Sequence, residues 1–202
     1  MFKDARNVLK ARSDELDIMI SNLMPNDRAE YSAIKKSSII MMIYNMIEGV
    51  FSILLQEIFD CVIQNSNNME KYPNHFHLIV SEYHLKDINS DAKKLLEFKN
   101  RAKMTIPEYN ECKKHIEFYS GNLDAKKIRK VANKFGVVKI IEEETDTKLV
   151  FVKNTRNDLA HGKSSYGEAT RDKTSKEIKE IKDAAVNLLY RVIKAFEKVY
   201  AN

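Results

Sequence analysis

The sequence predicts an all-α fold. Of its 202 residues, 31% are charged and 44% are hydrophobic, whereas Gly and Pro number only 5 and 3. So few turn-forming residues favour long helices over a turn-rich β fold. Apolar residues also recur at helical spacing along much of the chain. A chain of this length can bury one core, and no segment resembles a flexible linker, so residues 1–202 are predicted to form a single domain.

The first third of the chain predicts two helices. Residues 4–23 carry apolar side chains at helical spacing, and the pattern stops before Pro25. Asn26 or Asp27 can cap a second, longer helix that continues to about Ile63.

The segment Ile39–Leu55 of this second helix is strongly apolar. It nevertheless contains Asn45, Glu48 and Ser52, which falls short of a membrane span. It is therefore predicted to be the buried core helix, with no membrane partner.

Shorter elements are predicted after the core helix. They are a polar loop at 64–74, irregular or short helical pieces after it, helices at 91–103 and 107–119, a helix capped by 121–124 and ending at 135, a helix at 142–161, and a loop at 163–170. Residues 137–141 resemble a lone strand without a partner strand, so their structure stays open. Residues 172–200 predict a long, strongly amphipathic C-terminal helix.

The sequence indicates a reducing, cytoplasmic setting. The N-terminus lacks the apolar region of a secretory signal. Cys61 and Cys112 have no partners at metal-ligand spacing.

Positive charge is concentrated in the middle of the chain. The net charge is +5, and residues 93–134 alone hold 12 Lys or Arg against 5 Asp or Glu. Such a segment suggests a polyanionic partner, although a solvated helical face explains it about as well.

Arg156, Asn157 and His161 are the candidate catalytic residues. Asn157 and His161 lie 4 residues apart and share a helix face, while Arg156 lies about 140° from His161 around the axis. Gly162 is well placed to end the helix, which leaves the His161 imidazole exposed for general acid–base work. An ordinary surface or helix-cap histidine remains the alternative interpretation.

These residue types suit metal-free cleavage of RNA. The 2′-hydroxyl of RNA is its own nucleophile, so such an enzyme needs a base, an acid and a cation for the phosphorane. One chain offers one well-placed His, and a two-fold dimer would supply a second. The chemistry therefore predicts a homodimer.

Glu48 is a fourth candidate, on the core helix. A narrow polar stripe runs through the apolar side chains there and consists of Tyr44, Asn45, Glu48, Ser52 and Gln56. A buried carboxylate needs a partner, and Arg156 is the candidate. An ordinary Glu, exposed at an edge or paired with a Lys, is the alternative.

No metal or cofactor site is predicted. His75, His77 and His84 lie close in sequence, but no Cys or carboxylate accompanies them at matching spacing. The chain has no Gly-rich phosphate loop and no nucleophile elbow.

The run from Arg156 to His161, followed by Gly162, resembles the Arg-polar-x3-His motif of the HEPN superfamily. Further elements are similar to those of stand-alone prokaryotic HEPN proteins: Ile47-Glu48-Gly49, residues 121–124, Phe135-Gly136 and the long terminal helix. The resemblance covers about the last 160 residues and is closest from Gly121 onward.

The resemblance implies a helical bundle that dimerises through its motifs and acts as a metal-independent endoribonuclease in toxin or phage-defence systems. Arg156 and His161 would be catalytic, Asn157 supporting, and Glu48 would orient Arg156. A cognate antitoxin or defence partner is implied as well. The superfamily also includes non-catalytic nucleotide-binding and protein-interaction modules, which are the alternative.

One position departs from the pattern. Some toxin members carry a Tyr two places after the His, which an antitoxin modifies. Lys163 stands there in this chain, and Tyr166 is only a distant substitute.

Overall fold

The computed structural model describes residues 2–65, 71–88, 105–138 and 146–200. Within these ranges the chain forms helices and connecting turns without a strand, which confirms the all-α prediction. The helices are α1 (Lys3–Ser21), α2 (Ala29–Gln64), α3 (Asn74–Ile88), α5 (Tyr109–His115), α6 (Ala125–Lys134), α7 (Asp146–Ala160) and α8 (Ser175–Tyr200).

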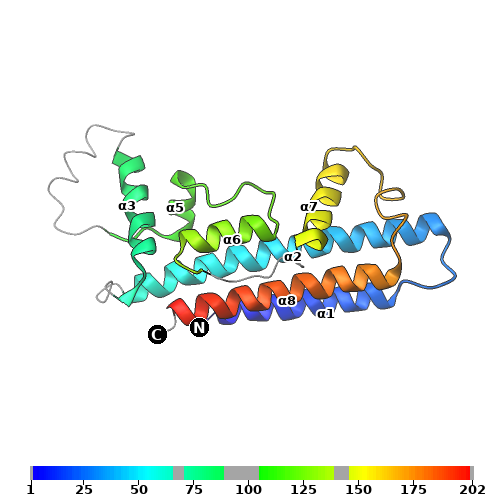
Figure 1. Ribbon diagram of the computed structural model, residues 1–202, viewed down its shortest axis with the longest axis horizontal. Helices are drawn as coiled ribbons and strands as arrows, with labels where there is room; N and C mark the ends of the chain where they lie inside the picture. Colours follow the sequence, from blue (N-terminus) through cyan, green and yellow to red (C-terminus); the bar gives the residue numbers. More distant parts are fainter. Residues whose placement is uncertain (1, 66–70, 89–104, 139–145, 201–202) are drawn as a thin grey trace.

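Three long helices form the base of the molecule. Helices α1, α2 and α8 run along its long axis, and the shorter helices α3, α5, α6 and α7 lie on one side of them (Figure 1). Arg6 pairs with Glu197, whereas Asp17 pairs with Lys182 at 2.7 Å. These two ion pairs fix α1 and α8 antiparallel to each other.

Helix α2 is the core helix, as predicted from its apolar segment. Its side chains from Ile39 to Val62 supply much of the buried core. By length and composition alone α2 would be able to cross a membrane, but 56% of its most apolar 18-residue window is buried inside the protein. Core helices pass the same test, so burial accounts for the apolar run.

An aromatic cluster holds α3 and α6 against α2. The ring of Phe59 lies 5.1 Å from that of Phe76 and 6.2 Å from those of Phe118 and Phe135, measured between centroids. Large aromatic side chains contribute much of the energy of such packing. This cluster anchors one end of α6, and its other end points towards α7 (Figure 1).

The predicted cap of α2 is wrong. Arg28 occupies the N-cap position without a side-chain cap bond. The carboxylate of Asp27 instead accepts a hydrogen bond from the Met24 N–H (3.2 Å) and pairs with Lys35 at 2.9 Å, which stabilises the turn between α1 and α2.

The predicted ends of α6 are confirmed. The Asp124 carboxylate accepts a hydrogen bond from the Lys127 N–H at 2.8 Å, and so caps the helix. Gly136 follows the helix with φ +77°, and a Cβ there would lie 3.0 Å from the Cβ of Pro73. Glycine is therefore required by both backbone conformation and space. Val137 donates its N–H to the Ala132 carbonyl at 2.9 Å.

The remaining elements agree with the sequence in part. The C-terminal helix is confirmed as α8, and Thr174 and Glu177 form a reciprocal capping box at its start. Helix α3 is 15 residues long where only irregular or short helical pieces were predicted. Three predicted stretches lie outside the described residues: the helix at 91–103, residues 139–141 of the ambiguous segment, and residues 142–145 at the start of the predicted helix 142–161.

Candidate active site

Helix α7 ends in a glycine cap directly after the motif. Gly162 adopts φ +65°, its N–H donates to the Leu159 carbonyl at 3.3 Å, and the Lys163 N–H donates to the Asp158 carbonyl at 2.8 Å. This pair of bonds is a Schellman motif. It stops the helix beside His161, whose side chain is exposed.

Arg156 lies against the core helix. Its guanidinium carbon is 4.9 Å from the ring centroid of Tyr44, a cation–π contact between α7 and α2. Its Nη1 also donates a hydrogen bond to the Oδ1 of Asn157 at 3.0 Å. Since Arg156 and Asn157 are half-buried, these contacts restrict the guanidinium of Arg156 to one region of the surface.

The hydroxyl of Tyr44 joins three parts of the chain. It lies 2.7 Å from the Glu48 carboxylate, is hydrogen-bonded to the Gly121 carbonyl, and accepts a bond from the Leu123 N–H at 3.4 Å. Burial raises the pKa of Tyr44 above its ordinary value, and the bond to Glu48 raises it further, although the Leu123 N–H and Arg156 act in the opposite direction. Tyr44 therefore remains protonated and connects α2 to the segment before α6.

Glu48 does not meet Arg156 in the predicted way. Within the described parts of the chain its hydrogen bond goes to Tyr44, and no ion pair joins it to Arg156. Tyr44 lies between them, with its ring against the guanidinium and its hydroxyl against the carboxylate. The physical reason is that Glu48 and Tyr44 are 4 residues apart on one face of α2, so the nearer partner satisfies the carboxylate.

Asn157 connects the motif to the segment before α6. Its Nδ2 donates to the Oδ1 of Asn122 at 2.7 Å, while its own Oδ1 accepts from Arg156. The three side chains thus form a hydrogen-bonded row that orients the amide and the guanidinium together. Sequence reasoning missed Asn122 as a site residue, although it lies in the 121–124 stretch.

An ion pair fixes α7 to the start of α6. The Lys153 ammonium lies 2.8 Å from the Asp124 carboxylate, which also caps α6. Burial acts to raise the pKa of Asp124, but the hydrogen bonds from Lys153 and from the Lys127 N–H outweigh it and hold the pKa below its ordinary value. Asp124 therefore carries its charge at neutral pH.

The His161 side chain is exposed, and it forms no hydrogen bond, ion pair or ring contact with another described residue. Lys163 and Tyr166 follow it on an exposed loop, and the Tyr166 carbonyl accepts a hydrogen bond from Ser37 at 2.7 Å. This bond holds the loop against α2.

His84 and His75 contact parts of the chain other than the motif. His84 is buried and bonds the Thr105 carbonyl at 2.7 Å, while His75 packs beside Gly136. Among the residues that the structure describes, no group of three or more His, Cys, Asp or Glu side chains is arranged to hold a metal.

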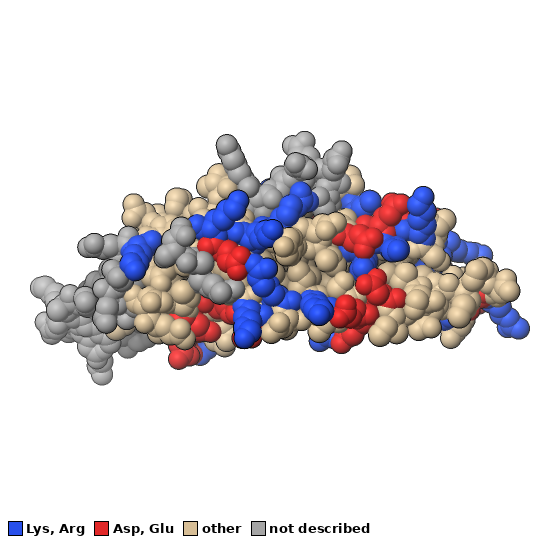
Figure 2. Space-filling model, turned by 90° about the horizontal axis from the view of Figure 1, so that it is seen from below, with Lys and Arg blue, Asp and Glu red and all other residues tan. Residues whose placement is uncertain are grey.

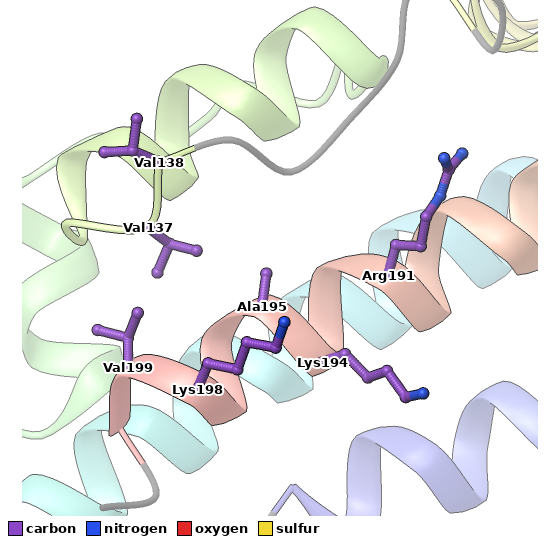
Figure 3. Close-up of a pocket in the computed structure, with 7 residues that line it drawn as sticks. All are labelled: Val137, Val138, Arg191, Lys194, Ala195, Lys198 and Val199. Carbon is purple, nitrogen blue, oxygen red and sulfur yellow. The ribbon is translucent and has the colours of Figure 1, made fainter.

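A separate pocket of about 380 Å³ lies near the C-terminal ends of α6 and α8 (Figure 3). Val137, Ala195 and Val199 form its apolar part, and Lys198 and Arg191 extend around it. None of the motif residues lines it.

The whole chain matches a known family. A family model described as HEPN_MAE_28990-like HEPN covers residues 3–202. The chain belongs to this HEPN family. The resemblance that rested on the run from Arg156 to Gly162 is thereby confirmed. No curated protein and no solved structure matches the chain.

Membership of the HEPN family assigns this chain to a protein family, but it does not establish a biochemical activity. HEPN domains are often ribonucleases, and others are nucleotide-binding modules. The choice between them depends on the residues at the end of α7.

Proposed function

We propose that this HEPN protein is a metal-independent endoribonuclease whose site consists of Arg156, Asn157 and His161. The observation that carries the proposal is the end of α7, where an exposed His follows an Arg that Tyr44 and Asn157 hold in place. The end of α7 thus carries both a group that can transfer a proton and a positioned cation, which are the groups that metal-free cleavage of RNA needs.

The reaction follows from these groups. His161 removes the proton from a ribose 2′-hydroxyl, and the 2′-oxygen attacks the adjacent phosphorus. The bond from phosphorus to the 5′-oxygen breaks, leaving a 2′,3′-cyclic phosphate on one fragment and a 5′-hydroxyl on the other. Arg156 stabilises the negative charge of the phosphorane.

A second copy of the chain completes the reaction. The leaving 5′-oxygen needs a proton from an acid, and the His161 of a two-fold-related copy provides one if the two α7 ends face each other. Exposure of His161 and of the neighbouring Ala160 leaves this end open for such pairing. Glu48 acts indirectly, because it accepts a hydrogen bond from the hydroxyl of Tyr44, whose ring lies against Arg156.

The biological setting that best fits this chemistry is a toxin or a phage-defence effector, with an antitoxin or defence partner that restrains it. A non-catalytic nucleotide-binding or protein-interaction module is the competing function. In that case the motif would serve packing alone, and the exposed His161 would be dispensable.

The test is cleavage of RNA by the purified protein in excess EDTA. Cleavage with 2′,3′-cyclic phosphate ends is expected for the wild type, and its loss is expected in His161→Ala. The matched control is His75→Ala, which removes another exposed imidazole and should leave cleavage intact. Equal cleavage by the wild type and His161→Ala, with both folded by circular dichroism, would reject the proposal.

A further inference from the structure

A basic groove follows one face of α6. It has a volume of about 450 Å³ and lies between residues 117–120 on one side and Lys127, Lys130, Val131 and Lys134 on the other. The lysines are spaced so that they share one face of α6. Gly121 and Asn122 follow residues 117–120 in the chain, and Asn122 accepts a hydrogen bond from the motif residue Asn157.

The charge of α6 is unbalanced within the helix. It contains Lys126, Lys127, Arg129, Lys130 and Lys134 and no acidic residue. Its opposite face is apolar and buried, so the basic side chains are directed outward. Asp124 at the N-cap is already paired with Lys153.

Two of the groove lysines are available to a ligand. The Lys134 ammonium is 2.7 Å from Glu82 and therefore neutralised locally. Lys127 and Lys130 have no ion pair with any described residue. Glu117 lies on the opposite wall and leaves the groove with a net positive charge.

Several basic side chains on the long helices are paired with carboxylates. On the face shown in Figure 2, acidic side chains lie next to basic ones, and Arg6, Arg12 and Lys182 each pair with a carboxylate. Arg191 and Lys198, which line the pocket of Figure 3, each already interact with another residue. The α6 groove differs from these surfaces because two of its lysines have no ion pair with a described residue and its wall precedes Asn122, the partner of Asn157.

We propose that the groove along α6 is an RNA-backbone subsite, in which Lys127 and Lys130 bind phosphates of the strand that extends from the cleavage site. This proposal rests on the proposed nuclease function. Phosphate contacts by lysine give affinity without sequence preference, and they make binding depend on salt. Lys127 and Lys130 are one helical turn apart, about 4.5 Å along the axis, so they would contact the backbone within a short stretch.

The test measures RNA binding separately from cleavage. In the full chain carrying His161→Ala, the affinity for a fluorescein-labelled 20-nucleotide single-stranded RNA is measured by anisotropy over a range of salt concentrations. The double variant Lys127→Gln/Lys130→Gln should bind about tenfold more weakly, and the slope of log affinity against log salt should become shallower by about 1.4.

Two further variants make this result specific. Lys176→Gln/Lys179→Gln removes two exposed lysines at the same spacing from α8 and should change affinity less than twofold. Lys127→Arg/Lys130→Arg keeps both charges and should bind like the parent. Unchanged affinity and slope in Lys127→Gln/Lys130→Gln, or an equal loss in the α8 variant, would overturn the proposal.

The two proposals fail in different ways. If the wild type does not cut RNA but its binding depends on Lys127 and Lys130, the subsite stands and the nuclease function falls. If the wild type cuts RNA while Lys127→Gln/Lys130→Gln binds like its parent, only the subsite is rejected.

Discussion

The guanidinium of Arg156 lies over the ring of Tyr44, with 4.9 Å between its carbon and the ring centroid. This contact joins α7 to the core helix at the motif. The same tyrosine hydroxyl contacts Glu48 and the backbone at Gly121 and Leu123. Tyr44 therefore supports the motif through both its ring and its hydroxyl. Substitutions at this position can test the contributions of the two groups separately.

The effect of replacing Tyr44 should depend on whether its ring or only its hydroxyl is removed. Tyr44→Leu removes the ring and the cation–π contact, worth about 1–2 kcal/mol when partly desolvated, so RNA cleavage should fall about tenfold or more. Tyr44→Phe keeps the ring but leaves the Leu123 N–H without its partner, which should lower the free energy of unfolding by about 1–3 kcal/mol. Cleavage rates and denaturant unfolding measure the two effects. Equal cleavage by both variants would contradict this role of the ring.

Asn122→Ala should reduce cleavage with little loss of stability. Asn122 is exposed, so its removal should cost less than about 0.5 kcal/mol. Asn157 would lose the bond that orients its amide, and Arg156 would become less well positioned. Single-turnover cleavage should slow several-fold, with Asn133→Ala, another exposed asparagine, as the control. A wild-type rate in Asn122→Ala would show that the bond has no positioning role.

Gly162→Ala should destabilise the protein through backbone strain alone. The φ of +65° costs an L-residue about 1–2 kcal/mol, and no atom lies within 4 Å of an added Cβ. Gly49→Ala is the matched control, because Gly49 also has open space around it but lies inside α2. That change should raise stability by about 0.5–1 kcal/mol. Thermal unfolding should move in opposite directions for the two variants, and a shift in the same direction would refute the argument.

Asp124→Asn should alter the acid sensitivity of folding. The native pKa of Asp124 is lowered, so its contribution is complete above the unfolded pKa of about 3.9 and is lost as pH falls through the native pKa. Partial exposure limits this contribution to about 1 kcal/mol or less. Asn still caps a helix, so the substitution isolates the charge.

The measurement for Asp124→Asn is urea unfolding at pH 7 and at pH 3. The variant should be less stable than the wild type at pH 7, and this difference should be smaller at pH 3. The exposed Asp14→Asn serves as the control, with a smaller difference at pH 7. A stability difference that grows as pH falls would contradict the assigned sign.

Ala160→Glu should separate the two copies of a dimer formed through the end of α7. Ala160 is exposed beside His161, and two facing copies would place like charges together. Sedimentation should shift from dimer to monomer, and cleavage should be lost in parallel. Asn187→Glu, at an exposed position on α8, should change neither. A dimer that persists in Ala160→Glu would place the interface elsewhere.

Much of the helical architecture was predictable because its causes are local. The apolar run of α2, the Asp124 cap, and the glycines after α6 and α7 all act within a few residues of the chain. The motif at 156–161 was recognisable for the same reason, since its spacing and its Gly162 cap lie in one segment. Helix α3 was not predicted at its full length, because its apolar residues follow no clear periodic face.

The partners of the motif residues required the tertiary structure. The sequence placed Arg156 and His161 at the end of a helix and suggested Glu48 as a partner for Arg156. The folded chain inserts Tyr44 between Arg156 and Glu48, and brings Asn122 to Asn157 across 35 positions. Periodicity shows which face a residue occupies, but helix packing sets which distant segment meets that face, and that packing depends on the whole core.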